Sequence, residues 1–176
     1  MTNHRIRRLA LLALLLMPAF HAKPAWAEPP RKIVIFEPEI EGDLSDQSRL
    51  PEWKARISHL SAALREDIAK GGLYTVADMA PAASSLAALE SRLQIHECQA
   101  CLVEVAKTLG AERILDFWVF RMSNLVLTLH LEIRDGRDGA ILLKRAYGFR
   151  GDNDHAWDMA EAFLIRDLAK VPAELR

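Results

Sequence analysis

The clearest hydrophobic pattern in this sequence is a strict alternation in its last third. Apolar residues occupy every second position from Leu125 to Ile133, and mostly polar residues stand between them. Side chains of a strand alternate between its two faces, so this pattern predicts a half-buried strand over 125–134. The turn-forming residues 135–139 and a second strand over 141–149 then complete a predicted hairpin.

Three further apolar runs predict strands. The continuous run over 33–36 is typical of a strand buried on both faces, and residues 73–76 predict a second short strand. The longer run over 113–122 is apolar on both faces, so it should form the central strand beside the hairpin. The polar and acidic residues 39–52 predict a surface loop instead.

Helical spacing accounts for most of the remaining apolar residues. A stripe from Trp53 to Ile68 predicts a helix of about five turns that ends at Gly71-Gly72. Further helices are predicted over 84–93, over 98–109 and, with Trp157 on the inner face, at the end of the chain. The resulting order, β-α-β-α-α-β-β-β-α, predicts an α/β fold. Its mixed sheet should end in an antiparallel meander, with helices packed against the sheet.

The N-terminal residues 1–27 have the features of a secretory signal peptide. Three arginines precede an apolar run over 9–20, and Ala25-Trp26-Ala27 matches an A-x-A cleavage signal. The competing interpretation is a membrane anchor, which needs roughly 20 apolar residues. The run over 9–20 is shorter than that. We therefore expect cleavage before Glu28, export to the periplasm, and a single α/β domain over 28–176.

Charge narrows the class of partner. The whole chain has 23 Lys and Arg residues against 24 Asp and Glu residues. Four of the basic residues and no acidic residue lie in the predicted signal peptide, so the exported part is acidic. An acidic domain is a poor candidate for binding nucleic acid, which favours a basic face. The exported part also has no apolar run long enough to span a bilayer.

The two cysteines are the most reactive-looking residues. Cys98 and Cys101 lie three positions apart at the start of a predicted helix, and an oxidising compartment permits a disulfide between them. We favour a structural disulfide. A helix N-terminus also lowers a thiol pKa, so a thiol–disulfide oxidoreductase is an alternative. Together with His96 the pair could instead bind a metal ion or small ligand.

No established catalytic motif occurs in the sequence. Nucleophile-elbow, P-loop, dinucleotide-binding and zinc-protease patterns are all missing. We therefore assign no catalytic residue, no cofactor and no metal ligand from sequence, and expect a protein that is not an enzyme.

The segment after the last predicted strand is dense in turn and capping residues. Gly151 allows a tight turn, and one of the polar residues 152–154 can cap the final helix. Arg150 can pair with Asp154, while Trp157 can anchor the helix on the sheet. The sharper alternative is that this turn is a recognition surface at one end of the sheet.

Three motifs carry a resemblance to a known family. Ser123-Asn124 precedes the alternating strand, and Arg150-Gly151-x-x-Asp154-x-x-Trp157 follows the hairpin; Cys98-x-x-Cys101 also stands before Leu109-Gly110-Ala111. With these residues the sequence resembles a domain-of-unknown-function family of secreted bacterial proteins, of the DUF2380 or DUF3280 type. Its strand–helix order is also similar to that of the TolB N-terminal domain and the curli-secretion lipoprotein.

The resemblance implies an α/β domain used for protein contacts in the cell envelope. It marks Ser123, Asn124, Arg150, Gly151, Asp154 and Trp157 as candidate interaction residues. It also suggests a quinoprotein dehydrogenase system as one possible client. The sequence thus favours a periplasmic accessory protein that binds an envelope partner through an exposed sheet edge or the 150–157 turn.

Overall fold

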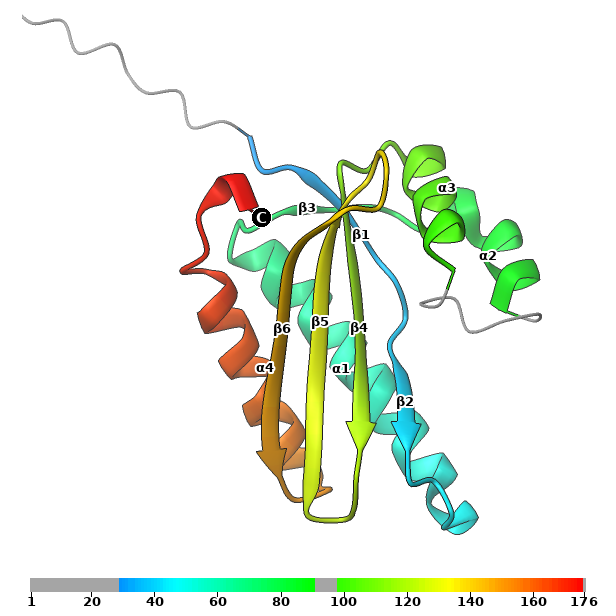
Figure 1. Cartoon of the computed structure of the whole chain (residues 1–176), viewed down its shortest axis with the longest axis vertical. Helices are drawn as coiled ribbons and strands as arrows, with labels where there is room; N and C mark the ends of the chain where they lie inside the picture. Colours follow the sequence, from blue (N-terminus) through cyan, green and yellow to red (C-terminus); the bar gives the residue numbers. More distant parts are fainter. Residues whose placement is uncertain (1–28, 91–97, 176) are drawn as a thin grey trace, which may run out of the picture.

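A mixed six-stranded sheet organises the computed structural model, which describes residues 29–90 and 98–175 (Figure 1). The strand order is β3-β1-β4-β5-β6, and β2 also pairs with β4. The predicted signal peptide and His96 lie outside the described residues. The strands are β1 (Lys32–Ile35), β2 (Glu39–Gly42), β3 (Thr75–Val76), β4 (Arg113–Arg121), β5 (Val126–Asp135) and β6 (Ile141–Arg150).

The sheet is parallel on one side and antiparallel on the other. Strand β1 runs parallel to both β3 and β4, whereas β4, β5 and β6 form an antiparallel meander. This confirms the predicted mixed α/β sheet with its C-terminal meander. The helices are α1 (Leu50–Lys70), α2 (Ala83–Glu90), α3 (Gln99–Leu109) and α4 (Asp154–Leu168).

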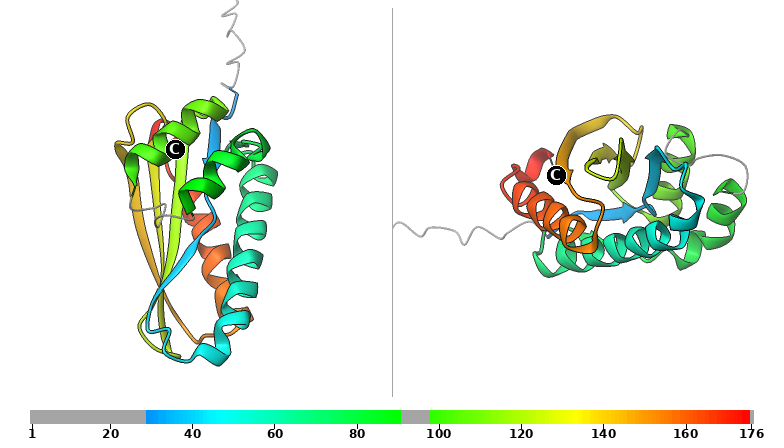
Figure 2. Two further views of the ribbon diagram at one scale, coloured as in Figure 1. Left: turned by 90° about the vertical axis from the view of Figure 1, so that its right-hand side faces the viewer. Right: turned by 90° about the horizontal axis from the view of Figure 1, so that it is seen from below.

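Helices cover the two faces of the sheet unequally. Ile33 and Ile35 point into a large core with α1 and α4, while Val34 points into a smaller core with α3. This split follows from the alternation of side chains along β1. Figure 2 shows α1 and α4 lying together on one face. On the opposite face, the lower halves of β4, β5 and β6 carry no described helix (Figure 1).

The prediction of a loop over 39–52 was wrong in two places. Residues 39–42 form β2, which pairs in parallel with β4 through four successive residue pairs from Glu39–Trp118 to Gly42–Arg121. The helix α1 begins at Leu50 and holds Pro51 in its first turn. A proline is compatible with that position because the first helical N–H groups have no intrahelical partner. A strand of four residues with a single apolar member leaves too weak a pattern to detect.

The alternating strand was predicted correctly except at its first residue. Leu127, Leu129 and Leu131 are buried as expected. Leu125 is 67% exposed because it lies in the β4–β5 turn, before β5 begins. The buried face of this strand therefore begins at Leu127, two residues later than the sequence predicts.

Strand β6 forms one edge of the sheet along its ten residues. Its backbone groups on the outer side are thus available to another strand. Among the described residues, no helix is long and apolar enough to cross a bilayer.

Candidate functional site

Three chain turns that are distant in sequence meet at the lower end of the sheet. The backbone N–H of Gly151 donates to the Leu125 carbonyl (3.2 Å), and that of Asp152 donates to Asn124 (3.0 Å). The Asp43 N–H in turn donates to Arg121 (2.8 Å). These bonds join the β6–α4 turn to the β4–β5 turn and the end of β2 to the end of β4, and Asp152 connects them to Trp53 near the start of α1.

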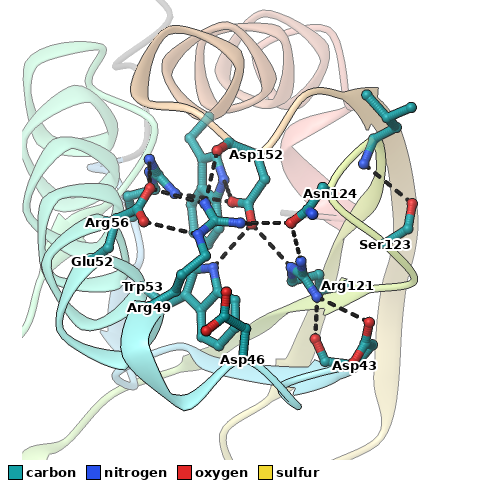
Figure 3. A network of polar contacts seen from close by, with 12 residues as sticks. Asp43, Asp46, Arg49, Glu52, Trp53, Arg56, Arg121, Ser123, Asn124 and Asp152 are labelled. Atoms are coloured by element: carbon teal, nitrogen blue, oxygen red, sulfur yellow. Dashed lines mark hydrogen bonds and ion pairs between the residues drawn. The ribbon is translucent and has the colours of Figure 1, made fainter.

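The Asp152 carboxylate lies at the centre of this junction (Figure 3). Its Oδ2 accepts from Trp53 Nε1 (2.9 Å) and from Arg121 Nε (3.0 Å). Its Oδ1 accepts from Arg56 Nη1 (3.1 Å) and Trp157 Nε1 (3.3 Å). We call the following set the Asp152 network: Arg49, Trp53, Arg56, Arg121, Asn124, Asp152 and Trp157.

The arginines of the network pair with Asp152 and with carboxylates around it. Three guanidinium groups surround Asp152, whose side chain is only 2% exposed. Burial alone would raise the Asp152 pKa, but hydrogen bonds from Trp53, Arg121 and Trp157, with the charge of Arg49, together hold that pKa below its ordinary value. Arg49 and Arg56 also bind Glu52, and the hydrogen bond from Arg49 is the main reason that the Glu52 pKa falls to about 2.

Aromatic contacts fix the positions of these cations. The Arg121 guanidinium lies 4.8 Å from the Trp53 ring centroid, and the Arg49 guanidinium lies 5.3 Å from it. Both distances are within the range of cation–π attraction. Because Trp53 is fully buried, its ring forms a rigid base for both arginines.

The structure brings some family-motif residues into this network and not others. Asn124 Oδ1 accepts from Arg49 Nη1 (2.6 Å) and also from Arg121. Ser123 stays local, because its Oγ accepts from the backbone N–H groups of Leu125 and Val126 (both 3.2 Å). Asn124 thus links two elements, whereas Ser123 shapes its own turn.

The expected pairing of Arg150 with Asp154 was wrong. Asp154 binds Arg56 Nε of α1 instead (2.7 Å), and Arg150 is exposed on β6. The helix cap is Asn153, whose side chain accepts from the Ala156 N–H (3.1 Å). Asp152 was one of the three residues considered as caps. Because Asn153 caps the helix instead, the Asp152 side chain can bond within the buried network.

Trp157 lies where the sequence placed it, on the inner face of α4. It is 3% exposed and meets Phe149 of β6 edge to face, with ring centroids 6.1 Å apart. Its Nε1 donates to Asp152, so the same side chain joins the large core to the polar network.

The cysteines form a disulfide at the N-terminus of α3, far from the Asp152 network (Figure 1). Their Cα atoms are 5.2 Å apart, and Cys98 Sγ accepts from the Cys101 N–H (3.3 Å). Over the part of the chain that the structure describes, no three His, Cys, Asp or Glu residues gather in a metal-binding cluster.

Two grooves flank α4. The β6–α4 groove has a volume of about 420 Å³. It is lined by Tyr147, Gly148, Phe149, Arg150, Asn153, His155, Ala156, Met159, Ala160 and Phe163. The α1–α4 groove has a volume of about 790 Å³. It is lined by Glu52, Ala55, Arg56, His59, Leu60, Ala63, Asp154, Trp157, Asp158 and Glu161.

Sequence reasoning did not identify the arginines of the network. Arg49 lies in the segment predicted to be a loop, and Arg56 stands on the polar side of a regular helix pattern. Arg121 offered the one usable signal, because it occupies an inward position of a strand whose neighbours at that face are apolar. A buried charge at such a position needs a partner from elsewhere in the fold.

The fold and site thus define a class of small mixed α/β protein in which a buried polar network connects the turns at one end of the sheet. A family model described as "Protein of unknown function (DUF2380)" matches residues 31–168, and the chain belongs to this DUF3280 family. No curated protein matches the sequence.

Solved structures of other proteins are similar in fold. The LpoB C-terminal domain from Escherichia coli superposes with a TM-score of 0.52 at 14% identity, covering 68% of this chain and 82% of that one. The PelC dodecamer from Paraburkholderia phytofirmans gives 0.51 at 13% identity, covering 80% and 86%. TolB from Acinetobacter baumannii gives 0.43 at 14% identity, covering 83% and 31%. The first two share the fold of this chain.

Proposed function

We propose that this protein is an exported, non-enzymatic accessory protein of the bacterial cell envelope that binds an extended segment of a partner protein in the β6–α4 groove. The observation that carries the proposal is an open sheet edge beside an apolar groove. Strand β6 ends the sheet, and Met159 and Phe163 of α4 stand 51% and 53% exposed next to it.

This geometry fits recognition by strand addition. In that mode an extended peptide pairs with an open edge, and alternate side chains enter a neighbouring groove. Tyr147 and Phe163 already meet edge to face across the groove, with ring centroids 5.6 Å apart. They offer an aromatic surface for an apolar side chain of the partner.

The charge of the groove indicates the charge of the segment that would bind there. Arg150 and His155 line the groove, and none of its described lining residues is acidic. A segment that alternates apolar and acidic residues would complement this surface. The partner is therefore an extended apolar–acidic segment of an envelope protein, and a quinoprotein dehydrogenase system is one candidate source of it.

The state of the Asp152 network supports a binding role over catalysis. A catalytic acid or base needs a position from which it can reach a substrate proton. The oxygens of the Asp152 carboxylate instead already accept hydrogen bonds from four side chains of the protein itself. The fold relative PelC assembles as a dodecamer, which supports a protein-binding role for this fold.

Selection from a displayed library of random octapeptides tests the proposal. We expect enrichment of sequences that alternate apolar and acidic residues, and NMR shift changes along β6 and α4 when a selected peptide is added. The variants Phe163→Ala and Arg150→Glu should each weaken its binding by at least about tenfold. Met122→Ala, at another exposed apolar side chain, serves as the matched control. Peptides of no common pattern, or equal binding to all variants, would contradict the proposal.

A second candidate function, thiol–disulfide exchange, is favoured by the disulfide at the N-terminus of α3. Its test is the reduction potential of Cys98 and Cys101. A value between roughly −270 and −120 mV is typical of exchange catalysts, and one below about −300 mV marks a structural bridge. We expect the structural value.

A further inference from the structure

The α1–α4 groove contains a buried carboxylate that the protein leaves partly unsatisfied. Glu161 lines this groove and is only 6% exposed. Its Oε1 has no hydrogen-bond partner among the described residues. A buried polar atom without a partner costs free energy, so a site that retains one points to a missing donor.

The other carboxylates of the groove already have partners. Glu52 binds Arg49 and Arg56, and Asp154 binds Arg56 as well. Asp158 lies 3.2 Å from His59 Nε2. Glu161 is therefore the group to which a donor from a ligand would add the most.

The surroundings of Glu161 select a cation. Burial raises its pKa to about 7, and the nearby charges of Asp67 and Asp158 act in the same direction. His59 and Arg166 oppose this rise. A positively charged donor would stabilise the ionised carboxylate against both burial and its acidic neighbours.

Besides Arg56 and His59, the remaining lining is apolar and suits a short hydrocarbon body. Leu60 and Ala63 of α1 face Trp157 of α4 across the groove. The volume of about 790 Å³ is in the range of small-molecule sites, which combine apolar walls with a few polar groups.

We propose that the α1–α4 groove binds a small primary amine, whose ammonium group donates to Glu161 while its aliphatic body lies against Leu60, Ala63 and Trp157. The site is distinct from the β6–α4 groove, on the other side of α4. Binding releases the proton of Glu161 to solvent, because the ammonium favours the carboxylate form. Affinity should therefore rise as the pH increases from 6 to 8.

Calorimetric titration with n-hexylamine tests this site, and n-hexanol serves as the neutral probe of similar shape. We expect hexylamine to bind at pH 8, to bind more weakly at pH 6, and to bind at least about tenfold more tightly than hexanol. Glu161→Gln should remove this preference for the amine. Glu104→Gln, an exposed glutamate of α3, is the matched control and should bind like the unaltered protein.

Glu161→Gln should also fold, because it replaces a buried acid by a neutral group of the same shape. Its thermal unfolding therefore provides a check on folding that needs no ligand. Equal hexylamine affinity in Glu161→Gln, equal affinity for amine and alcohol, or no binding of the amine would overturn the proposal. Octapeptide binding in the β6–α4 groove should be unchanged by Glu161→Gln, which separates failure of this site from failure of the proposed function.

Discussion

A single side chain, Asp152, joins three elements of the fold: α1, β4 and α4. Its carboxylate meets Trp53 and Arg56 of α1, Arg121 of β4 and Trp157 of α4. A buried ion pair is a weak source of net stability, but removal of one member leaves the other charge buried and unpaired. The network is therefore better understood as a device that fixes how these elements meet.

Asp152→Ala should destabilise the protein by about 3–5 kcal/mol, because Arg121 would lose its buried counter-charge. Urea unfolding at pH 7 measures this loss. Asp154→Ala is the matched control, since the Asp154 side chain is 81% exposed and its pair with Arg56 should contribute less than about 1 kcal/mol. Similar losses in the two variants would contradict the central role of Asp152.

The stability from Asp152 should also depend on pH. Its pKa is lower in the folded protein than in the unfolded chain, so the folded state favours the ionised form. That contribution is complete above the unfolded pKa of about 3.9 and is lost as the pH falls toward the folded pKa. The gap in unfolding free energy between the unaltered protein and Asp152→Asn should accordingly narrow below about pH 4. A gap that stays constant down to pH 3 would show that the carboxylate charge contributes little.

At the scale of elements, α4 has two faces with different roles. Trp157, Leu164 and Leu168 are buried against the sheet and α1, while Met159 and Phe163 remain exposed beside β6. The inner face anchors the helix, and the outer face lines the groove proposed to bind a partner. Stability and binding should therefore separate between residues of the same helix.

Trp157→Ala should destabilise the protein by about 3–5 kcal/mol, because it removes a buried ring and a donor to Asp152. Phe163→Ala should change stability by no more than about 0.5 kcal/mol, since half of that ring is already exposed. Thermal and urea unfolding of both variants measure the difference. A loss below about 1 kcal/mol for Trp157→Ala would mean that α4 is only loosely docked.

Elements with strong local patterns were predictable, and β2 was not. Strand β5 and helix α1 repeat their apolar residues over many positions, so their periods identify them. Strand β2 has one apolar residue, Ile40, and exists because its backbone can pair with β4. That pairing joins residues almost eighty positions apart, which no local pattern records.

At the scale of the whole molecule, the two sheet faces and two edges are not equivalent. One face is covered by α1 and α4, and β6 leaves one edge open (Figure 1). An open edge of this length can pair with the edge of another molecule and cause aggregation, unless a partner covers it or charges oppose self-association. The exposed Arg150 on β6 provides such a charge, whereas Lys144 and Arg145 pair with Glu132 and Asp167.

Export by a cleaved signal peptide remains a prediction, and it concerns the whole chain. N-terminal sequencing of the protein from a periplasmic fraction should find Glu28 as the first residue. Ala27→Arg should block cleavage, because the A-x-A signal needs a small residue there. Recovery of the uncleaved chain from the unaltered protein would show that residues 1–27 act in another way.

The sequence by itself determined the periodic parts of this protein: the meander, the long helices and the inward position of Trp157. These depend on side-chain alternation and helical spacing, which are local properties of the chain. Only the tertiary structure decided which polar residues meet, because the partners of Asp152 lie up to 103 positions away along the chain. It also decided that Glu161 Oε1 has no hydrogen-bond partner among residues 29–90 and 98–175, since burial and satisfaction of a carboxylate depend on every element packed around it.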